Sequence, residues 1–74
     1  MSERERKIID YIVICISEFA KQKGITKKDA YNYLKEYKGL EFLDECYEAE
    51  HTLSLNDAVE DLTEICKNNG GNIQ

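Results

Sequence analysis

The sequence predicts an all-α fold, a small compact bundle of about four helices with the first helix at its centre. Three observations predict it. The 74 residues contain no proline, the residue that interrupts a helix by removing a backbone donor and clashing with the preceding turn. Apolar residues recur three and four positions apart along most of the chain. Hydrophobic residues make up 42% and charged residues 34%, which is typical of a soluble globular domain.

The first helix is expected from about Glu3 to Lys23. Its segment "YIVICI" is rich in β-branched residues and, taken alone, could form a strand. The flanking segments "SERERK" and "SEFAKQK" continue the helical period without turn residues, and Gly24 follows where a left-handed helix end is expected. The apolar side chains cover an arc of roughly 200°, which is wide for a surface helix and indicates a central one.

The second helix is expected to begin after Thr26, which is a good N-cap residue. Asp29 then lies at the third helical position, where its negative charge suits the helix dipole. Ile25 and Ala30 occupy the two positions of a hydrophobic staple. Gly39 is expected to end this helix.

The last helix repeats the same capping pattern, with Ser54 as its N-cap and "NNGG" at its end. Shared capping chemistry explains the repeat more economically than a duplication does. The core stripe of this helix has six members at helical spacing: Leu55, Ala58, Val59, Leu62, Ile65 and Cys66. The intervening segment "LEFLDECYEAEHT" predicts one shorter third helix. Its inward residues would be Leu40, Leu43, Cys46 and Tyr47.

The chain is expected to be one domain over residues 1–74, with an ordered core at about 5–69 and a flexible tail at 70–74. The apolar run near the N-terminus is interrupted by Asp10, is too short to span a bilayer and lacks a cleavage pattern. We therefore expect a cytoplasmic protein without a membrane association. Three cysteines without a CxxC pair favour reduced thiols over a disulfide framework.

Charge is distributed unevenly around a net value of −5. Residues 21–38 carry six lysines against two acids, whereas residues 39–74 carry one lysine against nine acids. Such a split is compatible with intramolecular pairing, with head-to-tail association or simply with two solvated faces. The overall acidity makes a nucleic acid an unlikely partner.

Three segments resemble a family of short bacterial proteins known as domain-of-unknown-function family 3791. They are "YIVICI", "GIT…AYNYL" and above all "YEAEHT" leading into "VEDL", in which Tyr47, His51 and Thr52 form the most specific signature. The resemblance covers roughly residues 8 to 68. Glu50 departs from it, since an apolar residue is expected just before the histidine. The resemblance implies a small helical fold without an assigned activity, and relatives encoded beside ADP-ribosyltransferase-like, toxin-type proteins.

His51 is the only histidine in the chain. We expect its imidazole to hydrogen-bond a neighbouring backbone group or a tyrosine hydroxyl and so to fix the bend before the last helix. Contact with a partner is the main alternative, because no partner group for a catalytic base is identifiable. The spacing of Cys15, Cys46 and Cys66 argues against a metal site with His51. We therefore predict no catalytic, metal or cofactor-binding residues and no enzymatic activity.

The candidate interface lies on the first helix, where Tyr11 and Ile14 fall off the main apolar arc and Glu18 lies beside them. An exposed ridge there would be an association surface, and a helix wrapped on all sides is the equally weighted alternative. The predicted function is therefore a protein-interaction module that binds a partner protein, or itself as a homodimer. Its acidic second half could cover a basic active site, as an antitoxin-like regulator of a neighbouring enzyme does.

The alternative function is a helix-turn-helix DNA-binding regulator. The segment "KQKGITKKDAYNYLKEYK" places Lys27 and Lys28 in the first turn of a capped helix, and Asn32 is its best candidate for reading bases. Ordinary lysine coverage of a surface helix explains the same pattern.

Overall fold

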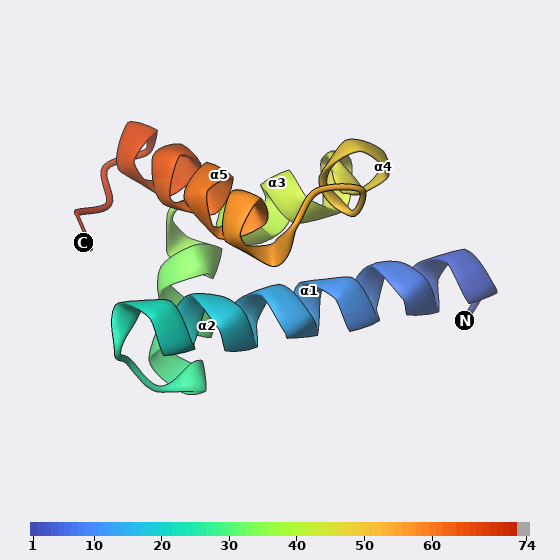
Figure 1. The fold of residues 1–74 in the computed structure, drawn as a ribbon, viewed down its shortest axis with the longest axis horizontal. Coiled ribbons are helices and arrows are strands. Elements are labelled where there is room, and N and C mark those ends of the chain that lie inside the picture. The colour runs from blue at the N-terminus through green and yellow to red at the C-terminus, as the bar shows by residue number, and fades with distance from the viewer. Residues whose placement is uncertain (73–74) are drawn as a thin grey trace.

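The computed structural model describes residues 1–72 and contains five helices in this part of the chain, without a strand (Figure 1). Their bounds are α1 Glu3–Lys23, α2 Lys27–Glu36, α3 Gly39–Glu45, α4 Tyr47–Glu50 and α5 Leu55–Asn68. The all-α prediction is confirmed. The Cα radius of gyration is 11.4 Å, as expected for a chain of this length in one compact body.

The helix α1 begins and ends where the sequence predicts. The Ser2 hydroxyl accepts a hydrogen bond from the Glu5 backbone N–H at 3.1 Å. At the other end Gly24 adopts the left-handed conformation, with a φ of 67°, and its N–H donates to the carbonyls of Ala20 and Lys21. The β-branched segment "YIVICI" is helical, because the good helix formers on both sides and the two caps outweigh its local strand preference.

The predicted N-caps of α2 and α5 are also confirmed. The Thr26 hydroxyl accepts from the Asp29 N–H at 3.0 Å, and the Ser54 hydroxyl accepts from the Asp57 N–H at 3.1 Å. Each hydroxyl satisfies a backbone donor that has no partner within its helix, so both helix starts are determined by local sequence.

The predicted role of Gly39 as a helix stop is wrong. The helix α2 ends at Glu36, Lys38 takes the left-handed conformation with a φ of 72°, and Gly39 is the first residue of α3. A Cβ atom at Gly39 would lie 2.8 Å from Leu34 Cδ2 and 3.2 Å from Cys66 Sγ. Glycine is therefore required here by the close approach of α2 and α5, not by its backbone freedom.

The predicted third helix is two helices. Cys46 ends α3, where its N–H donates to the Phe42 carbonyl, and its own carbonyl accepts from the N–H groups of Ala49 and Glu50 in the single turn of α4. The chain thus changes direction at Cys46. Of the four residues expected to face inward, Leu43 is buried, whereas Leu40, Cys46 and Tyr47 are half-buried.

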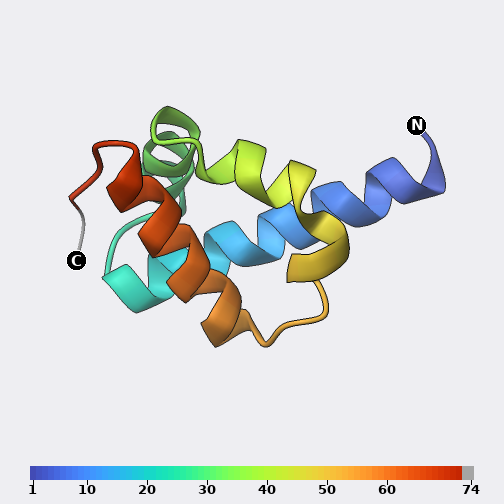
Figure 2. The same ribbon diagram turned by 90° about the horizontal axis from the view of Figure 1, so that it is seen from above.

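The core lies between α1 on one side and α3 and α5 on the other, with α2 packed across the C-terminal half of α1 (Figures 1 and 2). It consists of ten buried residues: Cys15, Phe19, Ala20, Ala30, Leu34, Leu43, Ala58, Val59, Leu62 and Cys66. Because α1 contacts α2, α3 and α5, it is the central element that its wide apolar arc predicts. Its N-terminal turns nevertheless extend beyond the other helices. Within residues 1–72, no helix combines the length and the apolar character needed to cross a membrane.

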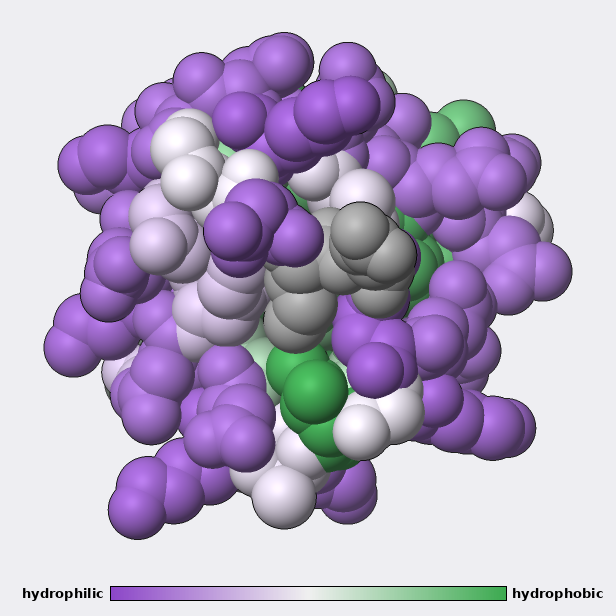
Figure 3. Space-filling model, turned by 90° about the vertical axis from the view of Figure 1, so that its left-hand side faces the viewer, coloured by the Kyte–Doolittle hydropathy of each residue, from purple (hydrophilic) through white to green (hydrophobic). Residues whose placement is uncertain are grey.

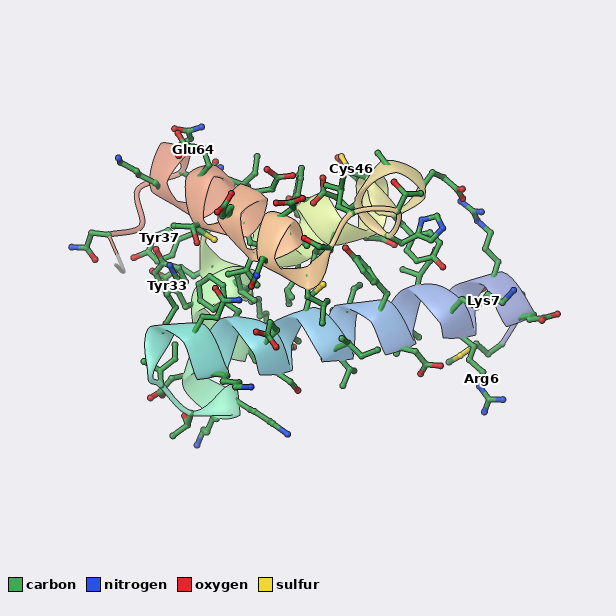
Figure 4. All side chains as sticks on the ribbon, in the orientation of Figure 1. Arg6, Lys7, Tyr33, Tyr37, Cys46 and Glu64 are labelled. Atoms are coloured by element: carbon green, nitrogen blue, oxygen red, sulfur yellow. The ribbon has the colours of Figure 1, made fainter. Side chains whose placement is uncertain are left out.

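The first residues of the expected flexible tail are packed against the bundle. The Gly71 N–H donates to the Cys66 carbonyl at 2.8 Å, and Gly71 is buried. A Cβ atom there would lie 2.2 Å from the hydroxyl of Tyr33, whose ring lies beside that of Tyr37 (Figure 4). Residues 73–74, the rest of that expected tail, lie outside the described residues. Figure 3 views this end of the molecule, where hydrophilic side chains cover most of the surface and leave only small apolar areas between them.

Candidate functional site

The most unusual surface feature is the uncovered side of α1. Ile9 is 45% exposed, Val13 55% and Ile14 50%. Ile9 and Val13 lie one turn apart on the same stripe, and Ile14 lies further round the helix. Neither stripe is covered by α2, α3 or α5. We call these three residues the α1 ridge.

A hollow of about 230 Å³ adjoins the α1 ridge in the angle between α1 and α3. Its apolar wall is formed by Ile8, Ile9 and Ile12, and the carboxylates of Glu5 and Asp44 lie at its sides. An apolar surface flanked by two acidic side chains suits an aliphatic side chain from a segment that also carries a lysine or an arginine.

The structure separates the residues predicted as an interface. Ile14 is half exposed, and Glu18 is half-buried and accepts a hydrogen bond from Gln22 Nε2 at 3.0 Å. Tyr11 is not part of an exposed ridge, because its hydroxyl is buried and its ring meets the Tyr47 ring edge-on, with 5.6 Å between centroids. A helical wheel could not reveal this, since α4 covers Tyr11 only after the chain turns at Cys46.

The family signature is a local structure at the end of α4. His51 Nδ1–H donates to the Tyr47 carbonyl at 2.7 Å, and the two rings stack with centroids 4.4 Å apart. The Thr52 hydroxyl donates to the Ala49 carbonyl at 2.7 Å. The hydrogen bond to a neighbouring backbone group, expected for His51, is therefore present, and it adds to the bond that the His51 N–H donates to the same carbonyl at 3.0 Å.

His51 is nevertheless exposed, and it borders a hollow of about 390 Å³ between α4 and the N-terminal turns of α1. Arg4 forms an ion pair with Glu48 across this hollow. Lys7 lines it as well, on the part of α1 that reaches past the other helices (Figure 4). Both partners of the ion pair are largely exposed, so the pair contributes little to stability.

Glu50 is a residue whose importance the sequence reasoning missed. It is 6% exposed, it is the only buried charged residue among residues 1–72, and its Oε1 atom has no hydrogen-bond partner. Its carboxyl group is hydrogen-bonded to the carboxyl group of Asp61 on α5. Burial, and then the hydrogen bond and charge of Asp61, raise the pKa of Glu50 to about 7. The available signal was its place in the sequence, where an apolar residue is expected.

A second polar group is buried beside this carboxyl pair. The Tyr11 hydroxyl lies next to the Cys15 thiol, a weak hydrogen-bonding group, and has no stronger partner within the described residues. Burial is the main cause that raises the pKa of Tyr11, and the charges of Glu50 and Asp61 add to it. Two buried polar groups with unmet hydrogen-bonding capacity thus lie between α1, α4 and α5.

Two of the three cysteines, Cys15 and Cys66, are buried free thiols. Burial raises the pKa of Cys15 and raises that of Cys66 to about 11, which keeps both thiols protonated at neutral pH. Cys46 is half-buried at the junction of α3 and α4, where Figure 4 shows it. No group of three or more histidine, cysteine or acidic side chains could hold a metal ion in the part of the chain that the structure describes.

The residues of the alternative DNA-binding function are all exposed on α2. Lys27 and Lys28 lie in its first turn, and Asn32 lies in its second. The surface around them also carries Tyr31, which is 44% exposed and has the Lys35 ammonium group 5.9 Å from its ring centroid.

Comparison with known proteins identifies a family. A model of the family described as "Protein of unknown function (DUF3791)" matches residues 10–69. No curated protein and no solved structure matches the chain.

Proposed function

Because the chain belongs to the DUF3791 family, whose description names no activity, we propose its function from the molecule itself: it is a protein-interaction module that docks a partner protein on the uncovered side of α1. The module performs no reaction of its own and acts in the cytoplasm. The partner is held by apolar contact with the α1 ridge and by charge pairing with the acidic groups around it.

The single observation that carries this proposal is the exposure of the α1 ridge. Ile9, Val13 and Ile14 each leave about half of their surface in water within two turns of one helix. Burying the remainder contributes about 1 kcal/mol for each side chain, so the ridge is an anchor that needs a surrounding interface. A typical interface takes about 800 Å² from each partner, which is about a sixth of the 4936 Å² surface of this molecule.

Charge indicates the chemistry of the partner. Glu5 and Asp44 flank the hollow beside the ridge, and exposed Glu45 extends this acidic surface along α3. Glu41 and Glu48, further along, are paired with Lys38 and Arg4. The net charge of −5 has the same sign. The fitting partner is therefore a protein with a basic surface around one or two aliphatic side chains. An antitoxin-like regulator needs an acidic surface of this kind, because it covers the basic active site of a neighbouring enzyme.

The test is co-purification of the full chain with the product of the neighbouring gene. Ile9→Asp and Val13→Asp place a charge in the centre of the ridge and should weaken binding at least tenfold. Tyr31→Asp is the matched control, because it changes an equally exposed apolar residue on α2. Retention of full affinity by both ridge variants would overturn the proposal.

A second copy of the chain is the other occupant to be tested. Self-association would appear as a mass that rises with concentration and that returns to the monomer value in Ile14→Asp. A mass that stays monomeric across concentrations while the neighbouring protein still binds would leave the heterologous partner as the occupant.

The DNA-binding alternative is supported by the exposure of Lys27, Lys28 and Asn32 on one helix. It predicts retention of duplex DNA that falls steeply with salt and is lost in Lys27→Glu and Lys28→Glu. Retention that those variants leave unchanged would exclude α2 as a DNA-reading helix.

A further inference from the structure

We propose that the carboxyl groups of Glu50 and Asp61 form a proton-operated latch: a shared proton holds the chain from Cys46 to Ser54 against α1 and α5, and loss of that proton releases it. We call residues 46–54 the α4 segment. This inference goes beyond the proposed docking role and does not depend on it, because it concerns the stability of one part of the fold.

The α4 segment has few other attachments. Its helix is a single turn of four residues, which is far too short to be stable alone. At its ends, the Cys46 N–H donates to the Phe42 carbonyl of α3, and Ser54 caps α5. Between these ends, Tyr47 contacts the Tyr11 ring, and Glu48 pairs with Arg4 at the surface. The hydrogen bonds of His51 and Thr52 join residues within the segment and do not hold it to the bundle. The hydrogen bond between Glu50 and Asp61 is therefore one of the few side-chain contacts that hold the segment to α5.

The groups that face Glu50 come from every helix packed around it. Asp61 on α5 is hydrogen-bonded to it, and the Tyr11 hydroxyl and Cys15 thiol face it from α1. A hollow of about 300 Å³ opens beside the pair, and its remaining wall is formed by Phe42 of α3 and by Glu64 and Ile65 of α5. Figure 4 shows Glu64 on the outer side of α5.

None of these facing groups carries a positive charge, and no lysine or arginine among residues 1–72 acts on the Glu50 carboxyl. Two carboxylates within hydrogen-bonding distance repel each other strongly when both are ionised, and neither could then donate the hydrogen bond that joins them. The docked arrangement therefore contains a proton between Glu50 and Asp61.

The lack of a partner for Glu50 Oε1 agrees with this state. When the carboxyl group is neutral, burying its carbonyl oxygen without a hydrogen bond costs little free energy. Burying a charged carboxylate oxygen in the same position costs much more. Ionisation of Glu50 therefore disfavours the buried position of its side chain, and movement of the α4 segment away from α5 is the response that we infer.

The pH range follows from the direction of the shift. The pKa of Glu50 rises from 4.5 to about 7 on docking, so the proton favours the docked state most fully below about 4.5 and stops doing so as the pH passes about 7. Between these values the equilibrium constant for release rises about tenfold per pH unit, and above about 7 it levels off. Release uncovers Tyr11 and Cys15 on α1.

The experiment uses the full chain labelled with ¹⁵N and ¹³C. The side-chain carboxyl signals of Glu50 and Asp61 report their titration, and amide protection factors report docking of residues 47–53, each measured from pH 5 to pH 8. Glu50→Gln is the central variant, because its amide donates to the Asp61 carboxylate without a titrating proton. Glu48→Gln is the control, because it neutralises an exposed carboxylate on the same helix.

We expect protection of the wild-type segment, relative to the rest of the chain, to fall tenfold or more between pH 5 and pH 7.5. The same ratio should stay constant in Glu50→Gln and should fall as in the wild type in Glu48→Gln. Asp61→Asn is a second test of the latch, since removal of the neighbouring charge should lower the pKa of Glu50. Titration of Glu50 near 4.5 with the segment still docked, or equal pH dependence in the wild type and Glu50→Gln, would overturn the latch.

Discussion

At the scale of single residues, Glu50 and Gly39 both have roles that depend on contacts between helices. Each occupies a position whose requirement comes from another helix, Asp61 on α5 in the first case and Leu34 on α2 in the second. Sequence patterns describe a residue relative to its neighbours along the chain, so they marked Glu50 only as a departure from the family resemblance and assigned Gly39 to a helix end. The structure shows the first to be buried and the second to be a close contact.

Glu50 should make the stability of the whole domain depend on pH. Because its pKa is raised to about 7 by folding, its ionisation opposes folding at higher pH, and Glu50→Gln should raise the free energy of unfolding by about 2 to 3 kcal/mol at pH 8. The gain should be below about 1 kcal/mol at pH 5. Urea unfolding at the two pH values measures both, and an equal gain at both would contradict the buried position of this carboxyl.

Gly39→Ala should destabilise the domain by about 1 to 3 kcal/mol. An added Cβ atom would lie 2.8 Å from Leu34 Cδ2, and the cost of overpacking exceeds the usual advantage of alanine over glycine inside a helix. Thermal unfolding measures the change. A stabilised variant would mean that Leu34 can move away without loss of packing.

At the scale of the elements, local chemistry determines where helices begin. Ser2, Thr26 and Ser54 each accept a hydrogen bond from the backbone N–H three residues later, and Thr26 and Ser54 were expected to do so from residue type and spacing. The end of α2 follows a different rule. Lys38, and not a glycine, takes the left-handed conformation there, because the next position must be glycine for packing.

Lys38→Gly should therefore stabilise the domain by about 1 kcal/mol, since a φ of 72° costs a lysine about that much and costs glycine almost nothing. The exposed pair with Glu41 that this change removes contributes little. Chemical denaturation measures the gain. As the contrasting case, Lys35→Gly lies inside α2 and should destabilise by about 1 kcal/mol.

At the scale of the whole molecule, the core is small and α1 contributes several of its buried residues. A domain of this size has a free energy of unfolding of roughly 4 to 11 kcal/mol, so no single core contact is dispensable. One side of α1, which carries Ile9, Val13 and Ile14, is not covered by the other helices, and its apolar arc is therefore only partly buried. The same geometry leaves the α1 ridge available to a partner.

Leu62→Ala should remove about 3 to 5 kcal/mol, because Leu62 is fully buried between α5 and the rest of the core. The variant should be partly unfolded at 37 °C, with a cooperative transition shifted to lower temperature in calorimetry. Leu55→Ala, which is 38% exposed at the start of the same helix, should cost less than about 1 kcal/mol.

The helical class, the bounds of α1, and the starts of α2 and α5 could all be predicted from the sequence. These features depend on hydrogen bonds and periodicities that extend over three or four residues, which one sequence contains in full. The family resemblance grouped Tyr47, His51 and Thr52, and the hydrogen bonds of His51 and Thr52 are indeed local.

Four features could not be predicted from the sequence and are seen only in the folded molecule. They are the turn at Cys46, the burial of Tyr11 and Glu50, the close contact that requires glycine at position 39, and the exposed side of α1. Each depends on which surfaces meet after the chain has folded back on itself, and residues such as Glu50 and Asp61 are 11 positions apart in the sequence. Contacts of that kind are set by the packing of whole helices, and the order of residues within one helix does not encode them.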